Sequence, residues 1–275
     1  MAERAFLLRF WGVRGSIACP GDAYVRYGGN TSCVEVRCGG HLFILDGGTG
    51  LRELGRDLLN GPPLYADILL SHTHLDHIIG VPFFRPLYQA RNRFRLWAGH
   101  LLPDGDLMDA LCKMMAAPLF PIPPAAFDAC ECRDFHAGEA LELRPGVIVR
   151  TAPLNHPNNA TGYRIEHAGR SICYVTDTEH RPGERDAAII GLVRDADIMI
   201  YDSTYTDEEY SSFAGWGHST WQEGVRLADA AGVKRLVIFH HDPSHDDGFM
   251  DEVAAKAHAA RPGTLVAREG MTLYP

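Results

Sequence analysis

The sequence predicts an α/β protein whose two similar halves pack into a single domain over residues 1–275. Short apolar runs of strand length recur in both halves, bounded by glycine, proline and asparagine turns. Each half passes from strand-rich segments to alternating strands and helices, the pattern of a layered α/β fold. With 46% hydrophobic and 22% charged residues, the chain can bury a large core.

In the first half, alternating or fully apolar runs predict strands at residues 6–11, 33–37, 41–45, 67–70 and 94–97. Gly39-Gly40 separates the second run from the third and is typical of a hairpin turn. Helical spacing predicts a helix at 51–59, which the prolines after Gly61 end. Residues 81–88 form an apolar, aromatic segment without a clear period.

The second half repeats this order. Strands are predicted at residues 147–152, 162–166, 171–176, 197–201 and 235–239, and short strands within 264–275. Helices are predicted at 186–194, 218–231 and 247–260. No low-complexity linker and no convincing sequence repeat separates the halves.

The segment at 103–127 differs from its surroundings. Residues 107–117 have helical spacing and several methionines, and residues 118–124 are apolar and rich in proline. A stripe of Met and Phe usually belongs to a core. The prolines favour a loop instead, so a lid insertion at 103–127 and plain packing both stay open.

Charge and composition exclude several classes of function. The net charge of −9 argues against a broad nucleic-acid-binding surface, although Arg91, Arg93 and Arg95 cluster locally. No apolar run reaches transmembrane length, and Met1–Arg4 lacks a signal-peptide core, so we expect a cytoplasmic protein without a membrane partner. The seven cysteines contain no Cys-x-x-Cys pair, which favours reduced thiols over a structural zinc ribbon.

The most informative stretch directly follows the predicted strand at 67–70. His72, His74, Asp76 and His77 fall within six positions, in the pattern His-x-His-x-Asp-His. Side chains two positions apart point the same way in extended chain, so His72 and His74 can face one point. Imidazole and carboxylate groups suit zinc, and also iron or manganese. Two adjacent ligand pairs therefore indicate two metal ions.

Three further ligand-type residues, His156, Asp177 and His240, each follow a predicted strand of the second half. Strand ends of a layered α/β fold converge on one edge, so these residues can join the cluster. The seven side chains would then form two groups around one shared aspartate: His72, His74 and His156; Asp76, His77 and His240; and Asp177, whose two oxygens could bridge two metals. Each metal would keep a position open for water.

These residues resemble the metallo-β-lactamase superfamily, and the resemblance covers nearly the whole chain. It rests on the turn at 45–50, the motif at 72–77 and the order of the three later residues. It implies a four-layer αββα sandwich with a metal pair at one edge, bound by the two groups above. His241 competes with His240 as the last ligand, and His240 is preferred because it comes first after the strand.

Gly217-His218-Ser219-Thr220 resembles the His-Ser-Thr element of the phosphodiesterase branch, which includes ribonuclease Z and the phosphonate-pathway phosphodiesterase. The loop around Asn30 also resembles this branch, which makes Asn30 a candidate for lining the pocket or for supporting a metal ligand. The resemblance implies a phosphoric diester hydrolase in which a metal-bridged hydroxide attacks phosphorus, Asp76 orients or deprotonates this water, and His218 protonates the leaving oxygen. Asp46 and Asp202 are expected to orient ligand histidines, and His180 to line the pocket. Asp46 begins a glycine-rich turn that lacks the remaining residues of a phosphate-binding loop.

The substrate expected from the sequence is a small phosphodiester, such as a cyclic nucleotide. The chain is acidic and lacks the long basic arm of ribonuclease Z, so a large structured RNA is not expected. Zn²⁺ is the default for both metals, with Mn²⁺ or Fe²⁺ as alternatives. A homodimer stays open. The competing functions are a lactonase or thioesterase of the glyoxalase II type, and a metal-binding sensory module without turnover.

Overall fold

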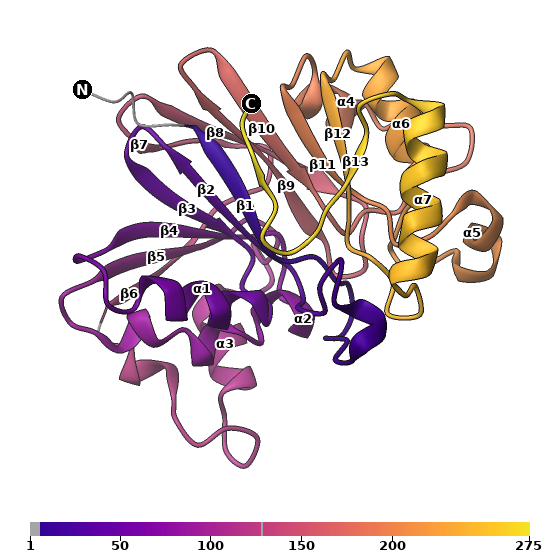
Figure 1. The fold of residues 1–275 in the computed structure, drawn as a ribbon. Coiled ribbons are helices and arrows are strands. Elements are labelled where there is room, and N and C mark those ends of the chain that lie inside the picture. Colours follow the sequence, from indigo (N-terminus) through magenta and orange to yellow (C-terminus); the bar gives the residue numbers. More distant parts are fainter. Residues whose placement is uncertain (1–5, 128) are drawn as a thin grey trace.

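The computed structural model describes residues 6–127 and 129–275 and shows two facing β-sheets with helices on their outer faces (Figure 1). The amino-terminal stretch Met1–Arg4, where no signal-peptide core is expected, lies outside the described residues. Each sheet has seven strands. The order is β14-β1-β2-β3-β4-β5-β6 in the first sheet and β13-β12-β11-β10-β9-β8-β7 in the second.

In each half of the chain, the strands that come first pair antiparallel and the strands that follow them pair parallel. The first sheet contains β1 (Leu7–Gly12), β2 (Cys33–Cys38), β3 (His41–Leu45), β4 (Tyr65–Leu70), β5 (Arg93–Ala98), β6 (Cys130–Asp134) and β14 (Thr272–Leu273). The second contains β7 (Ala140–Arg144), β8 (Val147–Leu154), β9 (Ala160–His167), β10 (Arg170–Val175), β11 (Ile198–Asp202), β12 (Arg235–Phe239) and β13 (Leu265–Val266). Parallel pairing runs from β3 to β6 and from β10 to β13, which matches the strand–helix alternation in the sequence.

Most of the helices cover the two outer faces of the sheets. The α-helices are α1 (Gly50–Leu58), α2 (Leu75–Ile78), α3 (Leu107–Met114), α4 (Ala187–Val193), α5 (Asp207–Phe213), α6 (Trp221–Ala230) and α7 (Asp247–Ala260). Short 3₁₀ helices span Asp22–Tyr24, Val81–Phe83, Arg85–Tyr88 and Pro124–Ala126. Figure 1 shows α1 and α3 outside the first sheet and α4, α6 and α7 outside the second.

Side-chain alternation along the strands produces the layers. On β10, Ile172 and Tyr174 point into the core between the sheets, whereas Cys173 and Val175 pack in the core beneath α4 and α6. On β3, Phe43 and Leu45 likewise face the second sheet. Strands buried on both faces fit the nearly continuous apolar runs of the sequence. The predicted four-layer αββα sandwich is therefore confirmed.

Several predicted boundaries were wrong. Strands β6 and β7 and helix α5 were not predicted, and the apolar segment at 81–88 contains two 3₁₀ helices. Helix α6 starts at Trp221, because Thr220 is extended and its side chain caps the helix by accepting from the Glu223 amide. His218 therefore precedes the helix that it was expected to open.

The segment at 103–127 divides between core and surface. Leu107 and Leu111 of α3 are buried in the core outside the first sheet. The chain after α3 projects from the body of the molecule (Figure 1), and Leu119 is 79% exposed. Across the described residues, no helix is sufficiently long and apolar for a membrane crossing.

Candidate metal centre

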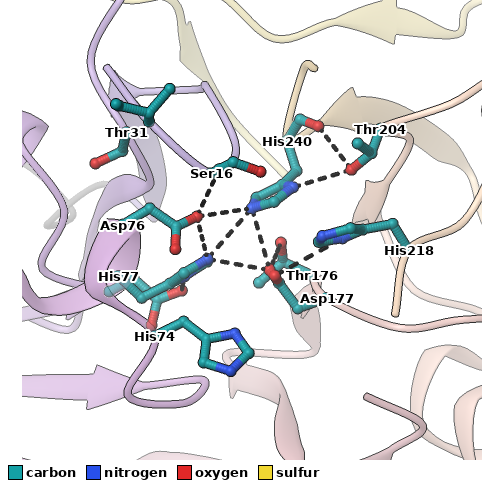
Figure 2. Close-up of polar contacts among 12 residues, drawn as sticks. Ser16, Thr31, His74, Asp76, His77, Thr176, Asp177, Thr204, His218 and His240 are labelled. Atoms are coloured by element: carbon teal, nitrogen blue, oxygen red, sulfur yellow. Dashed lines mark hydrogen bonds and ion pairs between the residues drawn. The ribbon is translucent and has the colours of Figure 1, made fainter. Parts of the chain in front are cut away.

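The predicted site residues follow the carboxyl ends of strands in both sheets. Residues 72–77 come after β4, His156 after β8, Asp177 after β10 and His240 after β12. Figure 2 shows Asp76, His77, Asp177 and His240, which come from three of these segments, pointing toward one another. The parallel strands of both sheets end at this edge, which is where open α/β sheets gather their polar residues.

Three residues that follow strands turn sharply into the site. Asp46, Asp177 and His240 have φ angles of 61°, 59° and 64°. This left-handed conformation is uncommon outside glycine and tends to occur at functional sites. Here it ends the extended run immediately after the strand, so the side chain enters the cluster instead of continuing along the sheet.

The first histidine group consists of His72, His74 and His156. Nδ1 of His74 lies 3.1 Å from Nε2 of His156. The His72 ring centroid is 4.4 Å from that of His74 and 4.8 Å from that of His156. One ligand atom from each side chain lies within 4.8 Å of the others, close enough for one metal ion.

The second group consists of Asp76, His77 and His240, and it is tighter. Nε2 of His77 lies 3.2 Å from Nε2 of His240 and 3.1 Å from Oδ2 of Asp76. Nε2 of His240 lies 3.3 Å from the same carboxylate oxygen. The predicted preference for His240 over His241 fits this geometry, because His241 turns away and its Nε2 donates to the Ala267 carbonyl at 2.8 Å.

Asp177 lies between the groups, with one oxygen toward each. Its Oδ1 is 3.7 Å from Nε2 of His72 and 3.8 Å from Nε2 of His156. Its Oδ2 is 3.2 Å from Nε2 of His77 and 3.4 Å from Nε2 of His240. The two oxygens of one carboxylate therefore serve different histidine groups.

The donor set fits divalent metal ions. Nε2 of His72 is buried without a hydrogen-bond partner, which is costly unless another group binds it. Burial lowers the pKa of His72 well below its usual value, so this imidazole is neutral and can offer a lone pair. Burial also opposes charge on His77, but Asp177, Asp76 and Asp46 raise its pKa well above the usual value. The three carboxylates therefore favour a positive charge at the second group, such as that of a metal ion.

The ring nitrogens that face away from the centre have partners that fix each ring. Asp46 accepts from Nδ1 of His77 at 2.7 Å, which is the contact that its expected orienting role requires. Asp46 also accepts hydrogen bonds from Ser71 and from the Tyr174 hydroxyl. The Gly217 carbonyl accepts from Nδ1 of His156 at 2.7 Å, and Oγ1 of Thr204 lies 3.0 Å from Nδ1 of His240. Such partners set the tautomer of a ligating histidine.

His218 joins the centre from the other side. Its Nδ1 lies 3.0 Å from Oδ2 of Asp202 and 3.8 Å from Oδ1 of Asp177. Burial alone would lower its pKa, but the neighbouring carboxylates, Asp202 first, raise it to about 9. Asp202 was expected to hold a ligand histidine, and the structure instead places it directly on His218. It reaches His240 only through the Thr204 hydroxyl.

Two other candidates lie near the centre without contacting it. Nδ1 of His180 is 2.8 Å from the Ser219 hydroxyl, and its ring stacks on Tyr210 beside a separate cavity. Asn30 bonds to Glu269 and Thr49 and so ties neighbouring loops together.

The loop at 14–16 supports the second group, a role that the sequence analysis did not predict. The Ser16 amide donates to Oδ2 of Asp76 at 2.8 Å (Figure 2). Gly15 packs against the His240 ring so closely that a methyl group there would lie 2.4 Å from it. Backbone groups such as the Ser16 amide and Gly217 carbonyl have no residue-type signature, so no sequence pattern could have identified them.

The αββα sandwich and its histidine–carboxylate cluster define a metallohydrolase-like protein. A model of the β-lactamase superfamily domain matches residues 42–241, so the chain belongs to the β-lactamase superfamily. Ribonuclease Z from Methanosarcina mazei is 26% identical over 265 residues, covering 79% of this chain and 84% of the relative. Ribonuclease Z from Gemmatimonas aurantiaca is 34% identical over 135 residues, 49% of this chain and 38% of that relative.

Solved structures share the fold. The metallo-β-lactamase fold protein YhfI from Bacillus subtilis has a TM-score of 0.75 at 19% identity, covering 99% of this chain and all of that one. A diphosphatase of the PhnP family has a TM-score of 0.72 at 22% identity, covering 98% of each chain. The family match and the ribonuclease Z relatives confirm the predicted superfamily, its phosphodiesterase branch and the prediction of a metal-dependent hydrolase.

Proposed function

We propose that the protein hydrolyses small phosphodiesters, cyclic nucleotides among them, with two divalent metal ions and His218 as the proton donor. The observation that carries the proposal is the division of Asp177 between two histidine groups, with His218 beside its Oδ1. Ribonuclease Z relatives and a PhnP-family diphosphatase of the same fold support phosphate-ester chemistry.

One ion would be held by the first group, one by the second, and Asp177 would contact both. Two such ions, with Zn²⁺ as the default, supply the positive charge that neutralises a phosphodiester and activates water at neutral pH. Each partner on the outward-facing nitrogens keeps its imidazole in the ligating tautomer. Asp76 is held by the Ser16 amide, so its carboxylate has a fixed direction for orienting the attacking water.

His218 suits the role of general acid. Asp202 binds its Nδ1, which directs Nε2 to the departing oxygen. The raised pKa of about 9 keeps the ring protonated at neutral pH, ready to donate. Proton donation by a positioned side chain contributes about 10²–10⁴-fold to a rate. A carbon-ester hydrolase with the same ligand set has no comparable need for this residue.

A small substrate agrees with the charge of the chain. The net charge of −9 disfavours the many phosphate contacts that hold a large RNA. The projecting part of 103–127 is apolar, and its Phe120 packs edge-on against Phe83 at 5.7 Å. We propose that this segment is a lid over small, partly apolar substrates.

The test is a parallel assay of the metal-loaded protein with cyclic nucleotides, bis(p-nitrophenyl) phosphate, lactones and thioesters. Phosphodiesters are expected to be hydrolysed fastest. His218→Ala should lower kcat on cyclic nucleotides by about 10²–10⁴-fold, because their alkoxide needs a proton. The loss should be smaller on bis(p-nitrophenyl) phosphate, since nitrophenolate leaves without one. Faster turnover of a lactone or thioester, or full cyclic-nucleotide turnover by His218→Ala, would refute the proposal.

A further inference from the structure

A row of aromatic rings leads from His218 to the protein surface. The Tyr205 ring lies 6.0 Å from that of His218, and Phe213 stacks on Tyr205 at 4.5 Å with an interplanar angle of 7°. Trp216 then meets Phe213 edge-on at 5.5 Å. Tyr205 is 4% exposed, whereas Trp216 is 64% exposed, so the row begins in the protein and ends in solvent.

The turn that carries Trp216 is fixed to the metal centre. Glu179 accepts from the Gly215 amide at 2.7 Å and from the Gly217 amide at 2.8 Å, one on each side of the tryptophan. The Gly217 carbonyl in turn accepts from Nδ1 of His156. Trp216 therefore occupies a defined position: one residue separates it from His218, and its direct neighbour Gly217 contacts the candidate metal ligand His156.

An indole in this position is placed to receive a flat group. A single exposed apolar side chain is ordinary. This one lies on an ordered turn, packs against Phe213 and is two positions before the proposed proton donor, and its free surface faces water. Aromatic side chains stack on nucleobases of any sequence, because every base has a π-face.

We propose that Trp216, braced by Phe213, is a stacking platform for a nucleobase or other aryl group of the substrate. The inference rests on the proposed function, since a phosphoryl group at the metal centre brings the attached nucleoside to this turn. A platform at Trp216 narrows the proposed substrate class to phosphodiesters that carry an aromatic group. Stacking alone would discriminate little between different bases.

The test compares adenosine 5′-monophosphate with ribose 5-phosphate, which lacks the base. Both are measured as ligands of the metal-loaded protein by isothermal titration calorimetry, which requires neither Trp216 nor turnover, and in the wild type also by quenching of tryptophan fluorescence. In the wild type, the nucleotide should bind about 10-fold more tightly or better, as expected for one stacked base. Quenching should come from Trp216, because Trp221 is buried and Trp11 and Trp97 are only partly exposed.

Substitutions separate stacking from folding. Trp216→Ala and Trp216→Gln should bring the affinity ratio of the two ligands below about 3-fold, while ribose 5-phosphate binds as before. Trp216→Phe should keep most of the ratio but lose the fluorescence change. Tyr274→Ala removes another exposed aromatic ring, one distant in sequence from this turn, and should alter neither quantity.

The outcomes distinguish this inference from the proposed function. If phosphodiesters are hydrolysed but Trp216→Ala keeps the affinity ratio of the wild type, the platform is refuted and the activity stands. If no phosphodiester is hydrolysed but the ratio still collapses in Trp216→Ala, the platform stands and the proposed activity is refuted.

Discussion

Nδ1 of His218 lies 3.0 Å from Oδ2 of Asp202, and both residues border the second histidine group. Asp202 is buried and also accepts from the Thr178 amide, so its carboxylate cannot turn away from the imidazole. In the proposed mechanism this contact fixes which nitrogen of His218 would face the substrate, and it stabilises the charged ring. Asp202 is thus a positioning residue that acts through His218.

Replacing Asp202 by asparagine should therefore impair proton donation and leave binding nearly intact. We expect Asp202→Asn to lower kcat on a cyclic nucleotide by about 10²-fold, with a much smaller change in KM. Because the carboxylate raises the pKa of His218, the alkaline limb of the kcat profile should move to lower pH. Steady-state kinetics from pH 6 to 10 would measure both effects. A purely structural role would lower kcat without moving this limb.

Asp177 offers a second test, because its two oxygens face different groups. Asp177→Asn keeps the shape but removes the charge, so bound metal should fall from two ions per chain to one or fewer, as measured by elemental analysis after gel filtration. Asp195→Asn is a matched control: Asp195 is exposed and has a φ of 52°, close to the 59° of Asp177. Asparagine tolerates this left-handed conformation at both positions. Two ions retained by Asp177→Asn would contradict its shared role.

His241 should make the metal-free protein sensitive to acid. Burial, with a contribution from Arg14, lowers the pKa of His241 to about 3. Its pKa in the unfolded chain is about 6.5. Below that value the unfolded chain therefore binds a proton that the folded protein excludes. The free energy of unfolding should fall by up to about 1.4 kcal/mol per pH unit from this residue as pH drops from 6.5 toward 3.

The measurement is urea unfolding of the metal-free protein at pH 4 to 7. His241→Gln retains a donor for the Ala267 carbonyl but does not titrate, so its unfolding free energy should depend less steeply on pH. His258→Gln changes an exposed histidine on α7 and should follow the wild type. Equal pH slopes for wild type and His241→Gln would exclude this contribution.

The sequence indicated the candidate ligands better than the groups that orient them. Strand periodicity placed His156, Asp177 and His240 at strand ends, and convergence of those ends follows from the layered fold. Thr204 and Gly217 could not be predicted in the same way, because one is an ordinary hydroxyl and the other acts through its backbone carbonyl. Their roles depend on how loops fold back over the strand ends, which local periodicity does not specify.

The edge elements show the same limit. Strands β6 (Cys130–Asp134) and β7 (Ala140–Arg144) lie at the ends of their sheets. Both are rich in polar residues and partly exposed. Their strand conformation depends on pairing with β5 and β8, not on an apolar pattern of their own. A hydrophobic pattern reflects burial. It therefore predicts buried central strands more readily than partly exposed edge strands.

A substitution at Gly15 can disturb the second group (Asp76, His77 and His240) without removing any of its ligands. The Gly15 backbone is not in the left-handed region, so alanine is conformationally acceptable, but the added methyl carbon would lie 2.4 Å from the His240 ring. That ring is also held by Thr204 and cannot move freely. We expect Gly15→Ala to displace His240 and to weaken the binding of one metal ion by about 10- to 100-fold, the usual effect of disturbing a ligand's support. Isothermal titration with Zn²⁺ should show one affected site and one unaffected site.

Gly105→Ala is the control for this prediction. It adds the same methyl group where no atom lies within 4 Å, so the variant should bind both ions like the wild type. Equal weakening of both sites in Gly15→Ala would indicate a general distortion and contradict a specific contact with His240.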